Sequence, residues 1–196
     1  DLGDRPPAWD IPGGREGGVK YTDYAIGEFI AQARKKPWFA DTLFVITADH
    51  CAAVAGKSKL PVGGYRIPLI FYAPKLVVPG EYTPTMSQID IPPTILDVLR
   101  ADGDDHFFGR SVFEVPGPPA RAFVSNYQSL GYLRDGVLTV LTPGRKVESF
   151  RVDPLTRETA PMPVDQAYAR EAIAYYQTAA RAFKQGALRA PGYAPH

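Results

Sequence analysis

The sequence has little cysteine, little net charge and no long apolar stretch, and each shortage excludes a class of protein. Among 196 residues only Cys51 is a cysteine, which excludes an intrachain disulfide and a multi-cysteine zinc site. Lys and Arg number 22 against 21 for Asp and Glu, so the chain has no strong field to attract nucleic acid. No apolar run approaches the length of a membrane-spanning helix.

Motifs of several common enzyme classes are missing as well. The segment GKSKL lacks the last glycine of a G-x-S-x-G elbow, so an α/β-hydrolase triad has no nucleophile here. No G-x-x-x-x-G-K-[ST] loop is present, and GGREGG does not have the spacing of a dinucleotide-binding loop. The basic residues are scattered, which again argues against nucleic acid as a partner.

The apolar pattern predicts an α/β fold in the first part of the chain. Helical spacing of apolar residues predicts a helix within residues 17–36, stopped by Pro37. The runs TLFVITA (42–48) and IPLIFYAP (67–74) predict strands covered on both faces, as in a parallel sheet. SQIDIPPTILDVLR (87–100) predicts a second helix with Asp90 as its N-cap.

Past residue 118 the pattern changes to short strands. Four segments predict an antiparallel meander with a hairpin at Asp135-Gly136: RAFVSNY, GYLR, VLTVLT and KVESFRV. An alanine-rich segment then predicts a helix over residues 164–185, ended by Gly186. We therefore expect one domain fragment over residues 1–196, with an α/β part at 1–118 and the meander and closing helix at 119–196. Because the sequence starts without Met, we expect it to be a piece of a longer polypeptide.

Asp49 and His50 stand where the first predicted strand ends. In open α/β sheets, ligands collect at the carboxyl ends of strands, and a loop there lets neighbouring side chains share a target. A carboxylate beside an imidazole suits a divalent ion such as manganese or zinc, in preference to calcium. The alternative is that Asp49 caps the loop and that His50 packs near the surface. Cys51 follows directly, and we expect it to be a small packed side chain and not a third ligand.

Four segments occur in an order and spacing typical of one enzyme group: DTLFVITADH, IPLIFYAP, SQIDIPPTILDVL and FFGRS. They resemble the sulfatase-like branch of the alkaline phosphatase superfamily. Within it, YTDYAIG and ADHCAAVAGKSKLP are similar to the lipoteichoic acid synthase group, which includes phosphoglycerol transferases. The resemblance implies a layered alkaline-phosphatase-like sheet with flanking helices. It also implies that Asp49 and His50 are metal ligands, with Mn²⁺ as the ion and Zn²⁺, Mg²⁺ or Ca²⁺ as alternatives.

The same resemblance implies residues that this sequence does not contain. Family members use a threonine nucleophile, or a modified cysteine or serine in true sulfatases, and a further acidic ligand, all upstream of these motifs. Neither motif occurs here, so we expect half a metal site and no activity from the chain alone. The family places a basic residue after the metal pair, and Lys57 is the candidate contact to the substrate anion, with a solvated lysine as the alternative. Tyr65 and Arg66 stand where many relatives carry a histidine.

The function implied by the resemblance is metal-dependent transfer or hydrolysis of a phosphoester. Phosphoglycerol from an anionic phospholipid is the expected donor, on the outer side of a cytoplasmic membrane to which upstream segments anchor the parent protein. A sulfatase acting on sulfate esters is the nearest alternative. A binding module that keeps the fold without catalysis is the alternative from another class.

Overall fold

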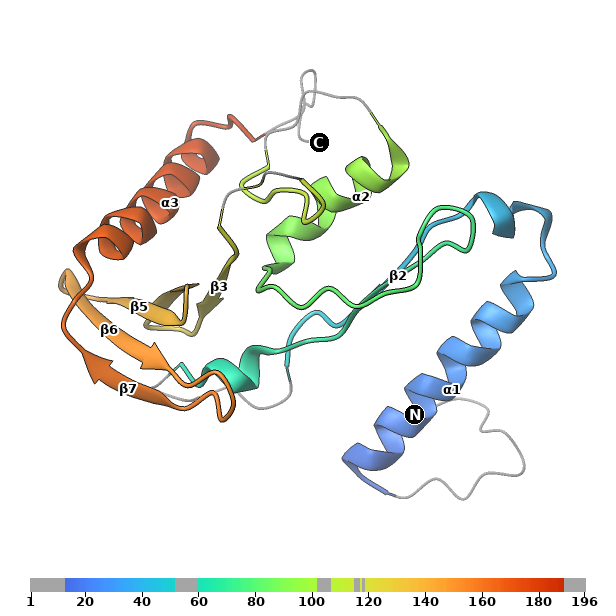
Figure 1. Ribbon diagram of the computed structural model, residues 1–196, viewed down its shortest axis with the longest axis horizontal. Coiled ribbons are helices and arrows are strands. Elements are labelled where there is room, and N and C mark those ends of the chain that lie inside the picture. The colour runs from blue at the N-terminus through green and yellow to red at the C-terminus, as the bar shows by residue number, and fades with distance from the viewer. Residues whose placement is uncertain (1–12, 52–59, 102–106, 115–116, 118, 189–196) are drawn as a thin grey trace. The chain divides into compact units, whose positions relative to one another are not determined.

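The computed structural model describes residues 13–51, 60–101, 107–114, 117 and 119–188. Its contacts divide the chain into two compact units, Asp1–Phe44 with Tyr72–Val78, and Val45–Phe71 with Pro79–His196. In the described ranges, helices and strands both occur, as expected of the α/β class (Figure 1). None of the described helices combines the length and the apolar character needed to cross a bilayer. The expected subdivision at residue 118 stays a prediction.

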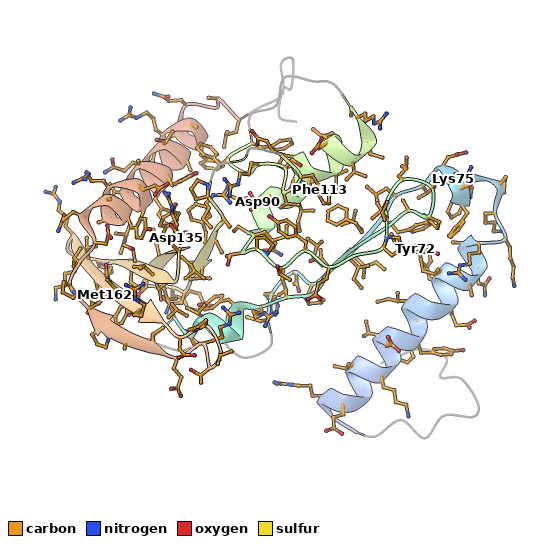
Figure 2. All side chains as sticks on the ribbon, in the orientation of Figure 1. Tyr72, Lys75, Asp90, Phe113, Asp135 and Met162 are labelled. Carbon is orange, nitrogen blue, oxygen red and sulfur yellow. The ribbon has the colours of Figure 1, made fainter. Side chains whose placement is uncertain are left out.

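The first unit is built around Phe44. Helix α1 (Arg15–Ala33) is followed by the 3₁₀ helix η1 (Pro37–Asp41), so the helix ends just before Pro37 as the sequence predicts. The ring of Phe44 lies 5.5 Å from Phe39 and 6.1 Å from Tyr72, measured between ring centroids. Figure 2 labels Tyr72, whose hydroxyl accepts a 2.9 Å hydrogen bond from Arg34. Aromatic packing of this kind therefore holds the unit together.

The apolar stripe predicted on α1 is only partly covered. Ala33 is buried, whereas Val19 and Phe29 remain exposed. An apolar stripe on a helix is stable when another element packs over it. Within the described part of the first unit, the aromatic cluster covers only the last turns of α1, so the stripe locates the helix correctly without being fully buried.

Strands β1 (Phe44–Thr47) and β2 (Leu69–Tyr72) form a two-stranded sheet. The Thr47 hydroxyl donates to the Pro68 carbonyl oxygen at 2.9 Å beside it. Both predicted strands exist, but the expectation that they are covered on both faces is wrong, because Ile70 on β2 is 52% exposed. No third strand pairs with these two in the part of the chain that the structure describes.

The predicted meander is confirmed, with one strand more than expected. A five-stranded antiparallel sheet has the order β3-β4-β5-β6-β7, formed by β3 (Arg121–Ser125), β4 (Leu130–Arg134), β5 (Val137–Thr142), β6 (Lys146–Val152) and β7 (Thr159–Met162). Asp135 and Gly136, with φ of 49° and 72°, form the turn between β4 and β5. Positive φ at both central residues is the signature of the hairpin turn that the Asp-Gly pair predicts.

The two faces of the meander pack against different partners. One face carries a buried cluster that includes residues before β2: Leu60, Val62, Val124, Leu133, Leu138, Val140 and Val152. Gly131 has no side chain there because a Cβ would meet Val124 at 2.6 Å and Leu60 at 2.9 Å. Helix α3 (Gln166–Lys184) lies against β4 and β5, as Figure 1 shows, and it confirms the predicted closing helix.

Helix α3 begins at a capped residue and approaches the sheet through alanines. The Asp165 carboxylate accepts hydrogen bonds from the backbone N–H groups of Ala167 and Tyr168 at 2.9 and 3.0 Å. Ala169 and Ala172 of α3 are buried. The small side chains of these two alanines let the helix backbone approach the meander closely.

Candidate functional site

The side chains of Asp49 and His50 point to the same place. After β1 ends at Thr47 the chain leaves the sheet, and the Asp49 Oδ2 to His50 Nε2 distance is 3.5 Å. The backbone N–H of His50 also donates to Asp49 Oδ1 at 2.9 Å. Both side chains are open to solvent, with 87% of Asp49 and 75% of His50 exposed. The break of the strand therefore brings together two groups that a continuing strand would hold on opposite faces.

A backbone contact defines which nitrogen of His50 carries a proton. His50 Nδ1 lies 2.9 Å from the carbonyl oxygen of Cys51. Because a carbonyl oxygen only accepts, Nδ1 carries a proton, and in the neutral form of the ring Nε2 then keeps its lone pair. Histidines that bind metals commonly donate their other N–H to a carbonyl in this way.

The separation of the two groups fits a shared divalent ion. Oxygen and nitrogen ligands lie about 2.0–2.2 Å from Zn²⁺, so two of them in tetrahedral geometry are about 3.4 Å apart. The observed 3.5 Å between Asp49 Oδ2 and His50 Nε2 agrees with that spacing. Among the described residues no group of three or more His, Cys, Asp or Glu gathers at one place. The expectation that Cys51 is a packed side chain and not a third ligand stays a prediction. Two residues fit a metal ion but do not complete its coordination.

Gln88 contacts the backbone of the same loop, and sequence reasoning missed it. It lies on the 3₁₀ helix η3 (Gln88–Asp90), directly before helix α2 (Ile91–Leu99). Its Nε2 donates to the carbonyl oxygens of Ala48 at 3.1 Å and Asp49 at 2.9 Å. The only signal in the sequence is the position of Gln88 inside the SQID motif, which gives no indication of a partner 39 positions away.

Asp90 is the N-cap of α2 by position, as predicted, but its carboxylate has another role. It accepts two hydrogen bonds from the Arg121 guanidinium at 2.8 and 2.9 Å, one from the Ser87 N–H at 2.8 Å and one from the Arg110 N–H at 3.0 Å. Figure 2 labels Asp90, which joins the start of α2 to β3. Burial works to lower the pKa of Arg121, but its hydrogen bonds to Asp90 and Tyr175 outweigh burial and raise it. The SQID motif therefore anchors α2 to the meander.

The FFGRS motif packs on this anchor. A Cβ at Gly109 would overlap with the carbonyl oxygen of Ile89, so only glycine lets the two backbones meet. That close approach places the Arg110 N–H on the Asp90 carboxylate. The SQID and FFGRS motifs, which are separate in the sequence, thus contact each other in the structure.

Asp49 and His50 line a pocket of about 730 Å³ within the second unit. Tyr65 and Arg66 line it too. The Tyr65 hydroxyl donates to the Ser125 carbonyl oxygen at 2.8 Å, and burial, then the charge of Cys51, raises the pKa of Tyr65. Lys57, the predicted contact to the substrate anion, lies outside the described residues and stays a prediction.

Comparison with known proteins gives the same family. Residues 13–101 match the family model described as Sulfatase. Phosphoglycerol transferase I of Xanthomonas euvesicatoria pv. vesicatoria (strain 85-10) is 27% identical over 143 residues, which are 69% of this chain and 20% of that protein. Phosphoglycerol transferase I of Xanthomonas axonopodis pv. citri (strain 306) is 26% identical over 143 residues with the same coverage. The chain thus spans about a fifth of the curated relatives.

Among solved structures, a protein in the alkaline phosphatase superfamily from Vibrio parahaemolyticus superposes with a TM-score of 0.84 at 30% identity. The match covers 95% of this chain and 47% of that one. This neighbour confirms the predicted fold class. The resemblance predicted from the sequence is likewise confirmed: the chain carries a sulfatase-family region and, with its phosphoglycerol transferase relatives and its alkaline phosphatase superfamily neighbour, is consistent with the sulfatase-like branch.

Proposed function

We propose that Asp49 and His50 are two ligands of a divalent ion, Mn²⁺ foremost, at the active site of an enzyme that transfers or hydrolyses a phosphoester. The observation that carries this proposal is the convergence of Asp49 Oδ2 and His50 Nε2 at 3.5 Å, with the other ring nitrogen satisfied by a backbone carbonyl. The remaining ligands and the nucleophile belong to other parts of the full-length protein.

The residues of this chain have separate roles in the proposed site. The Asp49 carboxylate supplies negative charge, and the Cys51 carbonyl keeps the His50 proton on Nδ1 so that Nε2 offers its lone pair. A bound divalent ion supplies Lewis-acid chemistry, lowering the pKa of a nucleophile's oxygen and neutralising charge that gathers on the phosphoryl group. Lys57 is proposed to pair with the anionic group of the substrate.

Phosphoglycerol from an anionic phospholipid is the proposed donor. The two relatives named phosphoglycerol transferase I support a transfer reaction. A phospholipid donor requires access to a membrane surface, and the family resemblance puts the proposed site on the outer side of the cytoplasmic membrane, with the parent protein anchored there. A test is release of phosphoglycerol from phosphatidylglycerol vesicles by the full-length protein.

Hydrolysis of a sulfate ester is the second candidate, favoured by the family model over residues 13–101. Both reactions need a cation that stabilises charge on a tetrahedral oxyanion, so the metal pair does not separate them. Parallel assays with an aryl sulfate and with phosphatidylglycerol vesicles distinguish the two reactions. Turnover of the sulfate alone would reject the phosphoglycerol proposal.

Manganese titration tests the metal site itself. We expect Asp49→Asn and His50→Gln in the full-length protein to weaken Mn²⁺ binding, followed by the electron paramagnetic resonance signal of unbound Mn²⁺, by more than the roughly 10- to 100-fold typical of an outer-shell change. Asp41→Asn, at a similarly exposed carboxylate, is the matched control and should bind as the wild type does. Unchanged affinity in both site variants would reject the proposed ligands.

A further inference from the structure

Both N–H donors of the Gln88 side chain contact the backbone at Ala48 and Asp49, beside the proposed metal ligands. A side-chain amide has two N–H donors, and the Gln88 Nε2 lies within hydrogen-bond distance of two carbonyl oxygens, those of Ala48 and Asp49. Both carbonyls come after β1, which ends at Thr47. Gln88 therefore donates the hydrogen bonds that a neighbouring strand would donate if strand pairing continued past Thr47.

The second of these carbonyls belongs to the peptide unit between the two candidate ligands. A peptide unit is planar, so fixing the Asp49 carbonyl also fixes the His50 N–H and the positions of the two Cα atoms that carry the side chains. That N–H is the group that donates to Asp49 Oδ1 at 2.9 Å. A single hydrogen bond from Gln88 thus bears on the orientation of both side chains.

The backbone on both sides of Gln88 is held in place by hydrogen bonds. Its neighbours Ser87 and Asp90 are buried and form a reciprocal capping box, in which the Ser87 N–H donates to the Asp90 carboxylate at 2.8 Å. Arg121 holds the other side of that carboxylate. The backbone that carries Gln88 is therefore clamped on both sides, while its side chain extends to the exposed loop.

We propose that Gln88 is a positioning residue, which holds the Asp49–His50 peptide so that both side chains face one ion before it binds. The proposal rests on the function proposed above. Without Gln88 the loop samples other orientations, and binding then carries the cost of ordering it. Removal of an outer-shell partner weakens metal affinity by roughly 10-fold or more.

The test uses Gln88→Met in the full-length protein, because Met has a similar length and no N–H donor. We expect Mn²⁺ affinity to fall roughly 10-fold. Gln128→Met, at an exposed glutamine of the β3–β4 turn, is the matched control and should leave affinity unchanged. Affinity of Gln88→Met within about twofold of wild type, while Asp49→Asn abolishes binding, would overturn the positioning role and leave the proposed function standing.

Amide hydrogen exchange in the metal-free protein supplies a readout that a merely structural role would not give. Gln88→Met should accelerate exchange at the His50 and Cys51 amides and leave unchanged the Arg110 amide, which donates to Asp90. Acceleration at Arg110 as well would mean that the substitution loosens the hydrogen-bonded segment around Asp90, and it would overturn the proposal. If Asp49→Asn leaves Mn²⁺ affinity intact, the proposed function fails, and exchange at His50 and Cys51 alone decides whether Gln88 orders the loop.

Discussion

Two acid–base pairs in the second unit are built in opposite ways. Asp90 and Arg121 are 2% and 3% exposed and meet through two short hydrogen bonds, whereas Asp49 and His50 are 87% and 75% exposed and stand 3.5 Å apart. Every lone pair of the buried carboxylate is used. In the exposed pair, Asp49 Oδ2 and His50 Nε2 are open to solvent.

The difference separates residues that hold the fold from residues that are open to a ligand. Breaking a buried ion pair is costly because the remaining partner stays charged without compensation. An exposed pair contributes little to stability, since water solvates each partner alone. Strong effects on unfolding are therefore expected at Asp90, and strong effects on ligand binding at Asp49.

The sharpest test of this contrast pairs Asp90→Ala with Asp49→Ala. Removing the buried carboxylate leaves the Arg121 charge unpaired, and we expect the free energy of unfolding to fall by about 3–5 kcal/mol in urea denaturation. Asp49→Ala should change it by less than about 0.5 kcal/mol. Equal effects at the two positions would mean that burial does not distinguish the pairs.

A second test attacks the buried pair from its backbone side. Gly109→Ala introduces a Cβ that overlaps with the Ile89 carbonyl and pushes the Arg110 N–H from Asp90, so we expect a loss of about 1–3 kcal/mol in the same measurement. Gly80→Ala is the control, because a Cβ there meets nothing within 4 Å. A Gly109→Ala protein as stable as the control would contradict the close packing of the two motifs.

The third test concerns alkaline pH. Burial raises the pKa of Tyr176 to about 12 from an ordinary 10.0, and burial together with Glu171 also raises the pKa of Tyr132. The folded state holds these protons more tightly, so stability is complete below about pH 10 and falls as pH rises toward 12. Tyr176→Phe should make this slope shallower in denaturation curves recorded between pH 10 and 12.

The hydroxyl lost in Tyr176→Phe also donates to the Gly131 carbonyl at 3.3 Å. Its removal lowers stability wherever the folded-state hydroxyl is protonated, and so already at neutral pH, where the slope is absent. Tyr127→Phe, at a fully exposed ring, serves as the control and should follow the wild-type curve. A slope identical in all three proteins would show that Tyr176 does not couple folding to proton release.

The sequence predicts those features that depend on neighbouring residues. The runs around Phe44 and Ile70 are rich in β-branched and aromatic residues and do form β1 and β2, and Asp135-Gly136 forms the predicted turn. Strand β7 was missed because Ala160 and Pro161 are poor strand residues, and it forms by pairing with β6. Local propensity is overridden there by the adjacent strand.

Features that join distant positions could not be predicted. The Asp49–His50 pair is adjacent in sequence and could be proposed from it, whereas Gln88 reaches it across 39 positions and Arg121 reaches Asp90 across 31. Nothing in the spacing of these residues indicates their contact, because it depends on how α2 packs against the meander. The expected burial of Ile70 failed for the same reason, since it depends on what covers the sheet.

The two outer strands of the meander each have a feature that limits association with other chains. At β3 the N–H of Phe123 is occupied by the Ser87 hydroxyl at 3.2 Å, and at β7 Pro161 has no N–H to offer. An incoming strand needs a continuous row of such donors to add itself to a sheet. The meander therefore resists edge-to-edge aggregation on both sides, one through a side chain of the motif that precedes α2 and the other through a missing donor.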